Sequence, residues 1–126
     1  MKIDCITFDC AKPAPLARFW CEVLDYEVAP YDDAEIERLT AMGIDDVEDD
    51  PSVLILPKDD GPRIFFQQVP ENKIAKNRVH LDVRLIETDV ERLVSLGAKV
   101  LSQPSTEQRW YVLSDPEGNE FCAILP

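Results

Sequence analysis

Val79-His80-Leu81-Asp82-Val83-Arg84 alternates apolar with polar residues, the pattern of a β-strand that has one buried face. A helical segment follows, ends at Gly97 and continues into the short strand Ala98-Lys99-Val100. The same layout occurs near the N-terminus, where a strand over residues 3–10 leads into a helix that ends near Asp25 and a short strand over residues 26–28. Because two more β-like runs follow each copy, the sequence predicts an α+β fold of two βαβββ modules, with a curved mixed sheet and a concave cleft.

The two main helices are marked by the spacing of their apolar residues. In the first helix a single apolar stripe recurs at helical intervals and consists of Leu16, Phe19, Trp20, Val23 and Leu24. Pro13 and Pro15 fall in its opening turn, where a missing N–H costs little. The second helix opens with the capping-box pattern Thr88-Asp89-Val90-Glu91. We expect Val90, Leu93 and Val94 to point inward and Gly97 to end this helix in the left-handed conformation.

The 126 residues predict one domain, with a first module over residues 1–70, a linker over residues 71–77 and a second module over residues 78–126. An insertion at residues 32–43 has no counterpart in the second module and predicts a short helix that carries Ile36, Leu39 and Met42. The acidic residues 45–50 indicate a solvated loop rather than a cation site, because they lack the alternating ligands and central glycine of a calcium loop. The remaining strands are expected at residues 52–56, 63–69, 109–114 and 120–125.

The charge balance excludes several classes of partner. The chain has 13 basic and 25 acidic residues, a formal net charge of −12, which argues against nucleic acid and anionic membranes as partners. The four cysteines, Cys5, Cys10, Cys21 and Cys122, form no CxxC pair and no metal-ligand spacing. With no signal peptide and no long apolar run, we expect a cytoplasmic protein with reduced thiols.

Several stretches, in the same order along nearly the whole chain, carry a family resemblance. They are Thr7-Phe8-Asp9-Cys10 followed by Leu16-Ala17-Arg18-Phe19-Trp20, then Phe65-Phe66-Gln67-Gln68-Val69-Pro70, Asn77-Arg78-Val79-His80-Leu81-Asp82-Val83 and Asp115-Pro116-Glu117-Gly118-Asn119-Glu120-Phe121-Cys122. With them the chain resembles the glyoxalase-like branch of the vicinal oxygen chelate superfamily, which includes bleomycin-resistance proteins and extradiol dioxygenases. The resemblance implies the glyoxalase/bleomycin resistance fold. The alternative is the dimeric ferredoxin-like barrel, which the βαβββ order and the turn before the last strand disfavour.

Strand alternation indicates which side chains line the cleft. The apolar set Val79, Leu81, Val83 and Leu85 should pack under the helices, which leaves His80, Asp82 and Arg84 on the concave face. When Asp9 is aligned with Asp82, Thr7 takes the position of His80. In the last strand Glu120, Cys122 and Ile124 share one face. Of Trp110 and Tyr111, one must face the concave side and offer an aromatic wall to a planar or apolar ligand.

His80, the single histidine, is the main candidate for chemistry. Beside Asp82, which would orient its imidazole, it could act as a general base. The candidate ligand-binding residues are Thr7, Asp9, Phe65, Gln67, Arg84, Trp110, Tyr111 and Glu120. Structural alternatives stay open: His80 can be incidental, and Asp9 and Asp82 can hydrogen-bond local backbone or Arg84. Cys122 is expected to be a small strand residue rather than a nucleophile, because no basic surroundings lower its pKa.

The resemblance also implies positions for a metal. In metal-dependent members of the superfamily the first and last strands of each half supply ligands, and these positions are Thr7, either Phe65 or Gln67, His80, and Cys122. At these positions His80 alone is a conventional ligand. The candidate metal ligands are His80, Gln67, Glu120 and Cys122, for nickel, zinc, manganese or iron. Since this set suits hard, oxygen-loving metals poorly, we expect no cofactor.

Three functions follow as hypotheses. The first is a glyoxalase-like protein that binds a small organic molecule in the cleft, or a non-canonical enzyme acting on it, without the usual divalent metal. The second is a metal-dependent lyase, isomerase or dioxygenase that uses His80, and the third is a protein-interaction module with a vestigial cleft. Bleomycin-resistance-like drug sequestration is a further alternative within the binding class. A homodimer is the expected assembly, and the resemblance allows a partner chain to complete the site.

Overall fold

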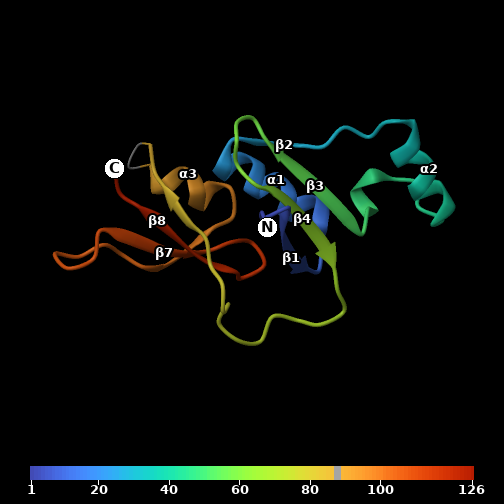
Figure 1. Cartoon of the computed structure of the whole chain (residues 1–126). Helices are drawn as coiled ribbons and strands as arrows, with labels where there is room; N and C mark the ends of the chain where they lie inside the picture. The colour runs from blue at the N-terminus through green and yellow to red at the C-terminus, as the bar shows by residue number, and fades with distance from the viewer. Residues whose placement is uncertain (87–88) are drawn as a thin grey trace. The chain divides into compact units, whose positions relative to one another are not determined.

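The computed structural model describes residues 1–86 and 89–126, which form two compact units, Met1–Asn72 and Lys73–Pro126. The elements of the first unit are β1 (Cys5–Cys10), α1 (Pro13–Leu24), β2 (Tyr26–Val28), α2 (Asp33–Ala41), the 3-10 helix η1 (Val47–Asp49), β3 (Ser52–Pro57) and β4 (Arg63–Gln68) (Figure 1). Those of the second unit are β5 (Asp82–Arg84), α3 (Val90–Ser95), β6 (Lys99–Ser102), β7 (Trp110–Ser114) and β8 (Glu120–Ile124).

Each unit contains a mixed four-stranded sheet, and the two sheets have the same strand order. The first sheet runs β1-β4-β3-β2 and the second runs β5-β8-β7-β6. In both sheets the first and last strands of the module pair in parallel, and the other neighbours pair antiparallel. The prediction of an α+β fold built from two similar βαβββ modules is confirmed.

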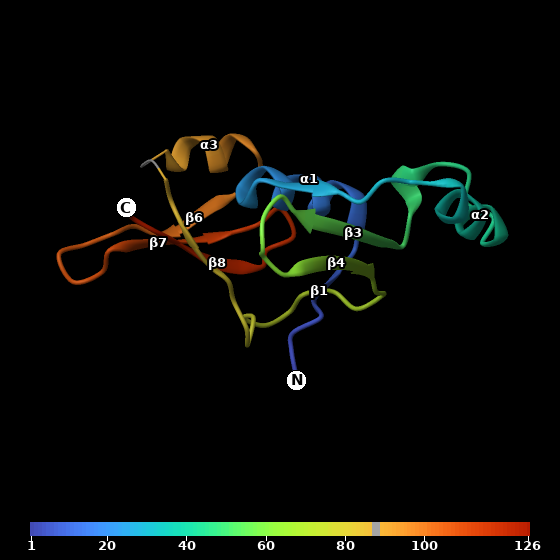
Figure 2. The same ribbon diagram turned by 45° about the horizontal axis from the view of Figure 1, so that its top comes forward.

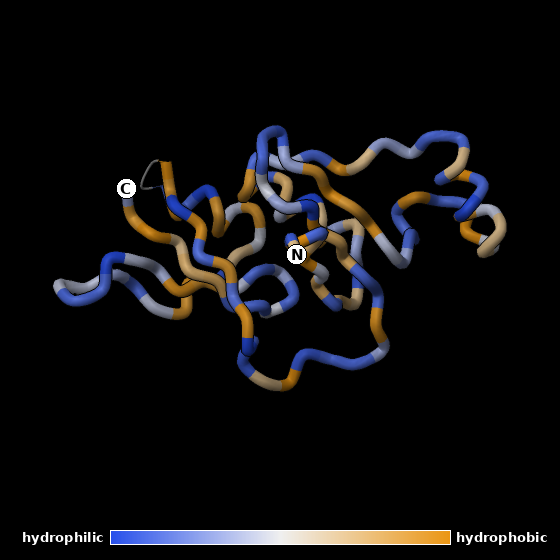
Figure 3. Tube along the Cα trace, viewed as in Figure 1, coloured by the Kyte–Doolittle hydropathy of each residue, from blue (hydrophilic) through white to orange (hydrophobic). Residues whose placement is uncertain are grey.

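Helix α1 covers one face of the first sheet and forms the core of that unit (Figure 2). Its predicted stripe is buried at Leu16, Phe19 and Trp20, each at most 4% exposed. Phe8 of β1 makes edge-to-face contacts with Trp20 and with Phe66 of β4, at centroid distances of 5.4 and 5.2 Å. Such pairs add roughly 0.5–1.5 kcal/mol each to the stabilisation from area burial. The apolar run of β3 stands out in Figure 3, and its Val53 and Ile55 complete this core.

The predicted insertion forms a helix, and part of the acidic segment after it is buried. Helix α2 begins after Asp32, whose carboxylate accepts a hydrogen bond from Glu35 N at 2.9 Å, and Gly43, with φ of 74°, follows its end. Leu39 is buried, whereas Ile36 and Met42 are exposed. The prediction of a solvated loop over residues 45–50 is wrong for Asp50, which is 1% exposed. This carboxylate is buried because α2 and β3 supply it with hydrogen-bond donors.

The first strand of the second unit is shorter than predicted. Strand β5 covers Asp82–Arg84, although backbone hydrogen bonds from Cys122 N to Leu81 O and from Leu85 N to Ile124 O extend its contact with β8. Val79 precedes this pairing and is 79% exposed, so the expectation that it packs under the helices is wrong. His80 likewise lies just before the strand rather than within it.

Helix α3 is a short helix that buries one side chain well. Asp89 caps it by accepting a hydrogen bond from Arg92 N at 3.0 Å; the predicted opening residue Thr88 lies outside the described residues. Leu93 is buried, but Val94 is 45% exposed, contrary to the prediction. A helix of six residues offers only a narrow inward face, and Val94 is turned by about 100° from Leu93. Gly97 follows with a φ of 117°, so the chain leaves the helix with the positive φ expected there.

The turn between β7 and β8 is organised by a buried carboxylate. Asp115, 2% exposed, accepts hydrogen bonds from Glu117 N, Asn119 N and Asn119 Nδ2, each at 2.9 Å. Gly118 N donates to Asp115 O, the bond of a tight turn, as the Pro-Glu-Gly sequence predicts. Among the described residues, none of the helices has the length and apolar character needed to cross a bilayer, and no disulfide joins the cysteines.

Candidate functional site

The second unit brings three chemistry-bearing side chains together. Strands β5 and β8 pair in parallel with Asp82 opposite Cys122, and His80 lies two residues before Asp82. The imidazole Nδ1 of His80 is 3.2 Å from Oδ1 of Asp82. One ligand atom from each of His80, Asp82 and Cys122 lies within 4.8 Å of the other two. Two of these residues were predicted as a catalytic pair, and the strand pairing adds the thiol to them.

A cavity of about 390 Å³ opens beside this group. The three polar side chains lie in its lining together with an apolar wall of Trp110, Val112 and Ile124. The register explains the wall: Trp110 is opposite Ile124 and Val112 is opposite Cys122, so these side chains share one face of the sheet. Of the two aromatic candidates, Trp110 therefore lines the cavity, whereas Tyr111 pairs with Ala123 on the opposite face.

The Cys122 thiol is held in its protonated form. Burial raises its pKa, and the negative charge and hydrogen bonding of Asp82 raise it further. A thiol with a raised pKa supplies little thiolate near neutral pH, and the thiolate is the nucleophile. This environment supports the expectation that Cys122 does not act as a nucleophile in the unliganded protein.

Glu120 lines the same cavity but is occupied by local hydrogen bonds. Its Oε2 accepts from Asn77 N at 2.9 Å, and Lys73 Nζ lies 3.2 Å from Oε1. Lys73 also donates to the carbonyl of Ala75. Burial raises the pKa of Glu120, and the hydrogen bonds from the backbone and Lys73 outweigh that effect and lower it. Glu120 thus fastens residues 73–77 to β8, which restricts its use as a ligand for a metal or substrate.

The remaining predicted residues belong to the first unit, except Arg84, which follows Asp82 on the same face of β5. In the first sheet Thr7 is opposite Phe65, and Asp9 is opposite Gln67. Cys122 is the residue opposite Asp82 in the second sheet, as Gln67 is opposite Asp9 in the first. When Asp9 is taken as the equivalent of Asp82, Gln67 is therefore the equivalent of Cys122. This selects Gln67 over Phe65 as the first module's equivalent of Cys122. Thr7, Asp9 and Gln67 are exposed, and Phe65 is partly exposed.

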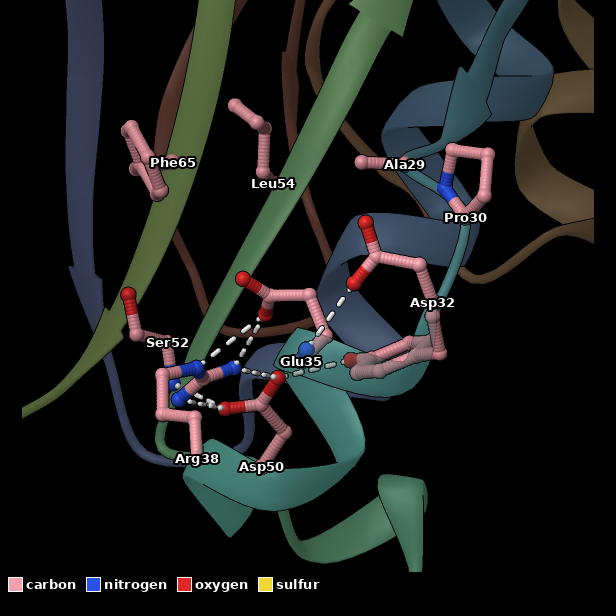
Figure 4. Close-up of a pocket in the computed structure, with 10 residues that line it drawn as sticks. Ala29, Pro30, Asp32, Glu35, Arg38, Asp50, Ser52, Leu54 and Phe65 are labelled. Carbon is pink, nitrogen blue, oxygen red and sulfur yellow. Dashed lines mark hydrogen bonds and ion pairs between the residues drawn. The ribbon is translucent and has the colours of Figure 1, made fainter.

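The first unit contains a larger cavity, and Phe65 is the one residue of its lining that the sequence analysis named as a ligand-binding candidate. It has a volume of about 530 Å³ and lies between the insertion helix α2 and strands β3 and β4 (Figure 4). Its polar part is built on Asp50, which accepts hydrogen bonds from Arg38, from Tyr31 Oη at 2.7 Å and from Ser52 N at 2.9 Å. Its apolar part includes Leu54 and Phe65. The sequence holds one signal for this polar network: Arg38 follows Glu35 by three residues, so the two side chains share a helix face and can form an ion pair.

Two βαβββ modules with matching sheet order define a protein of the glyoxalase/bleomycin resistance fold. The family profile described as a glyoxalase-like domain matches residues 5–124, so the chain belongs to this glyoxalase-like family. A search of curated proteins finds no match.

Solved structures agree with that assignment of the fold. The chain is similar to the fosfomycin resistance protein FosX from Mesorhizobium loti, with a TM-score of 0.63 and 15% identity over 98% of this chain and 90% of that one. It is similar to FosX from Listeria monocytogenes, solved with Mn(II) and 1S,2S-dihydroxypropylphosphonic acid, with a TM-score of 0.65 and 12% identity over 98% and 88%. It is also similar to a glyoxalase/bleomycin resistance protein/dioxygenase family enzyme from Burkholderia phytofirmans PsJN, with a TM-score of 0.64 and 15% identity over 99% of this chain and 98% of that one. At these identities the likeness shows the fold alone.

The donor atoms of the second unit decide which metal could bind there. His80, Asp82 and Cys122 offer one nitrogen, one oxygen and one sulfur atom. Manganese prefers oxygen ligands, so a set that includes a thiol does not fit it well. Zinc accepts sulfur, nitrogen and oxygen at about 2.0–2.3 Å. The residues therefore fit a zinc-like ion, provided that the separations of up to 4.8 Å close to the roughly 3.5 Å between ligand atoms of a tetrahedral site and Cys122 loses its proton.

Proposed function

We propose that the protein binds a small organic molecule in the cavity of its second unit, as a glyoxalase-like binding protein or a non-canonical enzyme that needs no divalent metal. The observation that supports this most directly is the His80–Asp82 pair at the polar side of a cavity with an apolar wall. A few polar groups that converge on an apolar cavity of about 300–1,000 Å³ are typical of small-molecule sites. The cavity volume of about 390 Å³ falls in that range.

The residues have distinct roles in this proposal. Trp110, Val112 and Ile124 would bury the apolar part of the ligand. With a proton on Nδ1, His80 donates to Asp82 and leaves Nε2 as an acceptor. In that tautomer Nε2 can accept a hydrogen bond from the ligand or remove an acidic proton from it. Asp82 would then act as a positioning residue that fixes the ring and the tautomer.

Tryptophan fluorescence offers a direct test. Trp110 is 38% exposed in the cavity wall, whereas Trp20 is 1% exposed in the first unit, so a ligand in this cavity should change the emission of Trp110 alone. A panel of small ring compounds would be titrated by fluorescence and by calorimetry. For any compound that binds, Trp110→Ala and His80→Ala should weaken binding at least fivefold, and Tyr111→Phe on the opposite face should not. Unchanged affinity in both cavity variants would refute the site.

A second candidate function is a metal-dependent lyase, isomerase or dioxygenase, which the convergence of His80, Asp82 and Cys122 favours. Elemental analysis after incubation with Zn, Ni, Mn and Fe(II) would test it. We expect zinc to outcompete manganese if a metal binds, because of the thiol donor. Cobalt(II) should then show the charge-transfer absorption of a cobalt–thiolate bond, and Cys122→Ser should lose it. No stoichiometric metal under any condition would exclude this candidate.

Two further parts of the proposal have separate tests. Drug sequestration, as in bleomycin-resistance proteins, would show as stoichiometric binding of a ligand that is recovered unchanged. A homodimer is supported by exposed apolar side chains such as Ile36, Met42, Val100 and Leu101. Light scattering at micromolar concentration should give twice the chain mass, and a monomer mass would refute the dimer.

A further inference from the structure

The insertion cavity of the first unit, defined by α2 with its preceding residues, Asp50, β3 and β4, carries an inference independent of the second unit's site. Its polar floor is fixed. Arg38 donates to both oxygens of Asp50, at 3.3 and 3.0 Å, and to Oε2 of Glu35 from Nε and Nη2, at 3.1 and 2.9 Å. Tyr31 Oη and Ser52 N complete the shell of Asp50, which is 1% exposed. This network holds the helix against the sheet and leaves the cavity open.

The residues that line the cavity carry a net negative charge. Asp32, Glu35 and Asp50 supply three carboxylates, and Arg38 is the one guanidinium in the lining. Asp50 is saturated by its donors. Glu35 uses only Oε2 for Arg38, and Asp32 uses Oδ1 for Glu35 N, so within the described residues the second oxygens of Glu35 and Asp32 have no hydrogen-bond partner. Two carboxylate oxygens are thus available to a ligand.

These carboxylates lie at the boundary between polar and apolar walls. In Figure 4 they are placed between the Arg38–Asp50 pair and the side chains of Leu54 and Ala29. Phe65, from β4, adds an aromatic ring to the apolar side. A ligand that fits both walls has a positive group joined to an apolar or aromatic body.

We propose that the insertion cavity binds an organic cation, with a protonated amine at the free oxygens of Asp32 and Glu35 and its apolar body against Leu54 and Phe65. The volume of about 530 Å³ accommodates a molecule of that kind. An ammonium group donates three hydrogen bonds, and charge-assisted bonds to carboxylates are about twice as strong as neutral ones. An anionic ligand would instead meet the two unpaired oxygens.

The test uses three probes of similar size on the full chain: benzylamine, benzyl alcohol and benzoate. Titrations followed by backbone amide shifts at low salt should give millimolar binding for benzylamine, as a fragment of this size allows. The largest shifts are expected at α2 and β3. Benzyl alcohol should bind at least fivefold more weakly, and benzoate should not bind.

Matched variants separate the cavity from the general acidity of the protein. Glu35→Gln and Asp32→Asn each remove one lining charge, and asparagine can still cap α2, so the fold should be kept. Each should weaken benzylamine about fivefold. Glu37→Gln removes the same charge from an exposed residue of α2 that does not line the cavity and should change affinity less than twofold.

Three outcomes would overturn the proposal. They are equal affinity for benzylamine and benzyl alcohol, equal effects of Glu35→Gln and Glu37→Gln, or benzylamine shifts confined to the second unit. Binding of calcium with the same dependence on Asp32 and Glu35, without benzylamine binding, would also overturn it, because the acidic oxygens would then serve an inorganic ion. Shifts confined to the second unit would point to binding beside His80, whereas the other results are independent of that site.

Discussion

Replacing Arg38 with methionine should destabilise the first unit through the carboxylate that it leaves behind. Arg38 makes two hydrogen bonds to Asp50, which is 1% exposed and ties α2 to the start of β3. Methionine keeps a similar side-chain length but donates nothing. Asp50 would keep Tyr31 Oη and Ser52 N as donors and lose the positive charge of its ion pair.

The size of the effect follows from the exposure of the two partners. Removing one member of a fully buried ion pair costs roughly 3–5 kcal/mol. The Arg38 side chain is 34% exposed, so solvent already screens part of the interaction, and two donors to Asp50 remain. We therefore expect the free energy of unfolding to fall by about 2 kcal/mol. For a chain of this length that corresponds to a fall in Tm of roughly 8 °C.

Urea denaturation followed by circular dichroism, with thermal melts alongside, measures this loss. The matched control is Arg18→Met, which removes the bidentate pair with Glu48, at 2.7 and 2.8 Å, where both side chains are about half exposed. We expect a much smaller loss there. The double variant Arg38→Met with Asp50→Asn should recover part of the stability, because no buried charge is left unpaired. Equal losses for Arg38→Met and Arg18→Met, or no recovery in the double variant, would refute the reasoning.

Three further predictions concern other parts of the chain. Glu120→Gln should lower the free energy of unfolding by about 1 kcal/mol at pH 7. Since folding lowers the pKa of Glu120, the carboxylate contributes fully to stability above the ordinary pKa of 4.5, and this contribution is lost as the pH falls through the folded pKa. Chemical denaturation at pH 3 should therefore show a smaller difference in the free energy of unfolding between the wild type and Glu120→Gln than at pH 7. Burial, with Glu22 and Glu27 nearby, raises the pKa of Cys21 to about 11, so about 1% of this thiol is thiolate at pH 9. Iodoacetamide should therefore label Cys21 at least tenfold more slowly than a small-molecule thiol of pKa 9.0, and peptide mass spectrometry measures that rate. Gly97→Ala should cost about 1–2 kcal/mol in urea denaturation, because φ is 117° and the added Cβ would lie 3.1 Å from Pro116 Cγ; an unchanged midpoint would contradict this.

The tertiary structure was needed wherever function depends on residues far apart in the chain. Asp82 and Cys122 meet because β5 and β8 pair in parallel in one register, and a shift of one residue would place Cys122 on the other face. The same pairing shows that Trp110, and not Tyr111, lines the cavity. The burial of Asp50 depends on an arginine twelve positions earlier, which no local pattern in the acidic segment could indicate.

The sequence alone determined the parts of the protein that depend on local periodicity. The stripe of α1, the alternation within Asp82–Arg84 and the turn at Asp115 each follow from side-chain spacing or turn chemistry within a few residues. The repetition of this layout determined the two-module fold. Strand register and the docking of α2 decided which residues line the two cavities. Both bring together side chains that are far apart in the chain, and local sequence patterns do not predict such contacts.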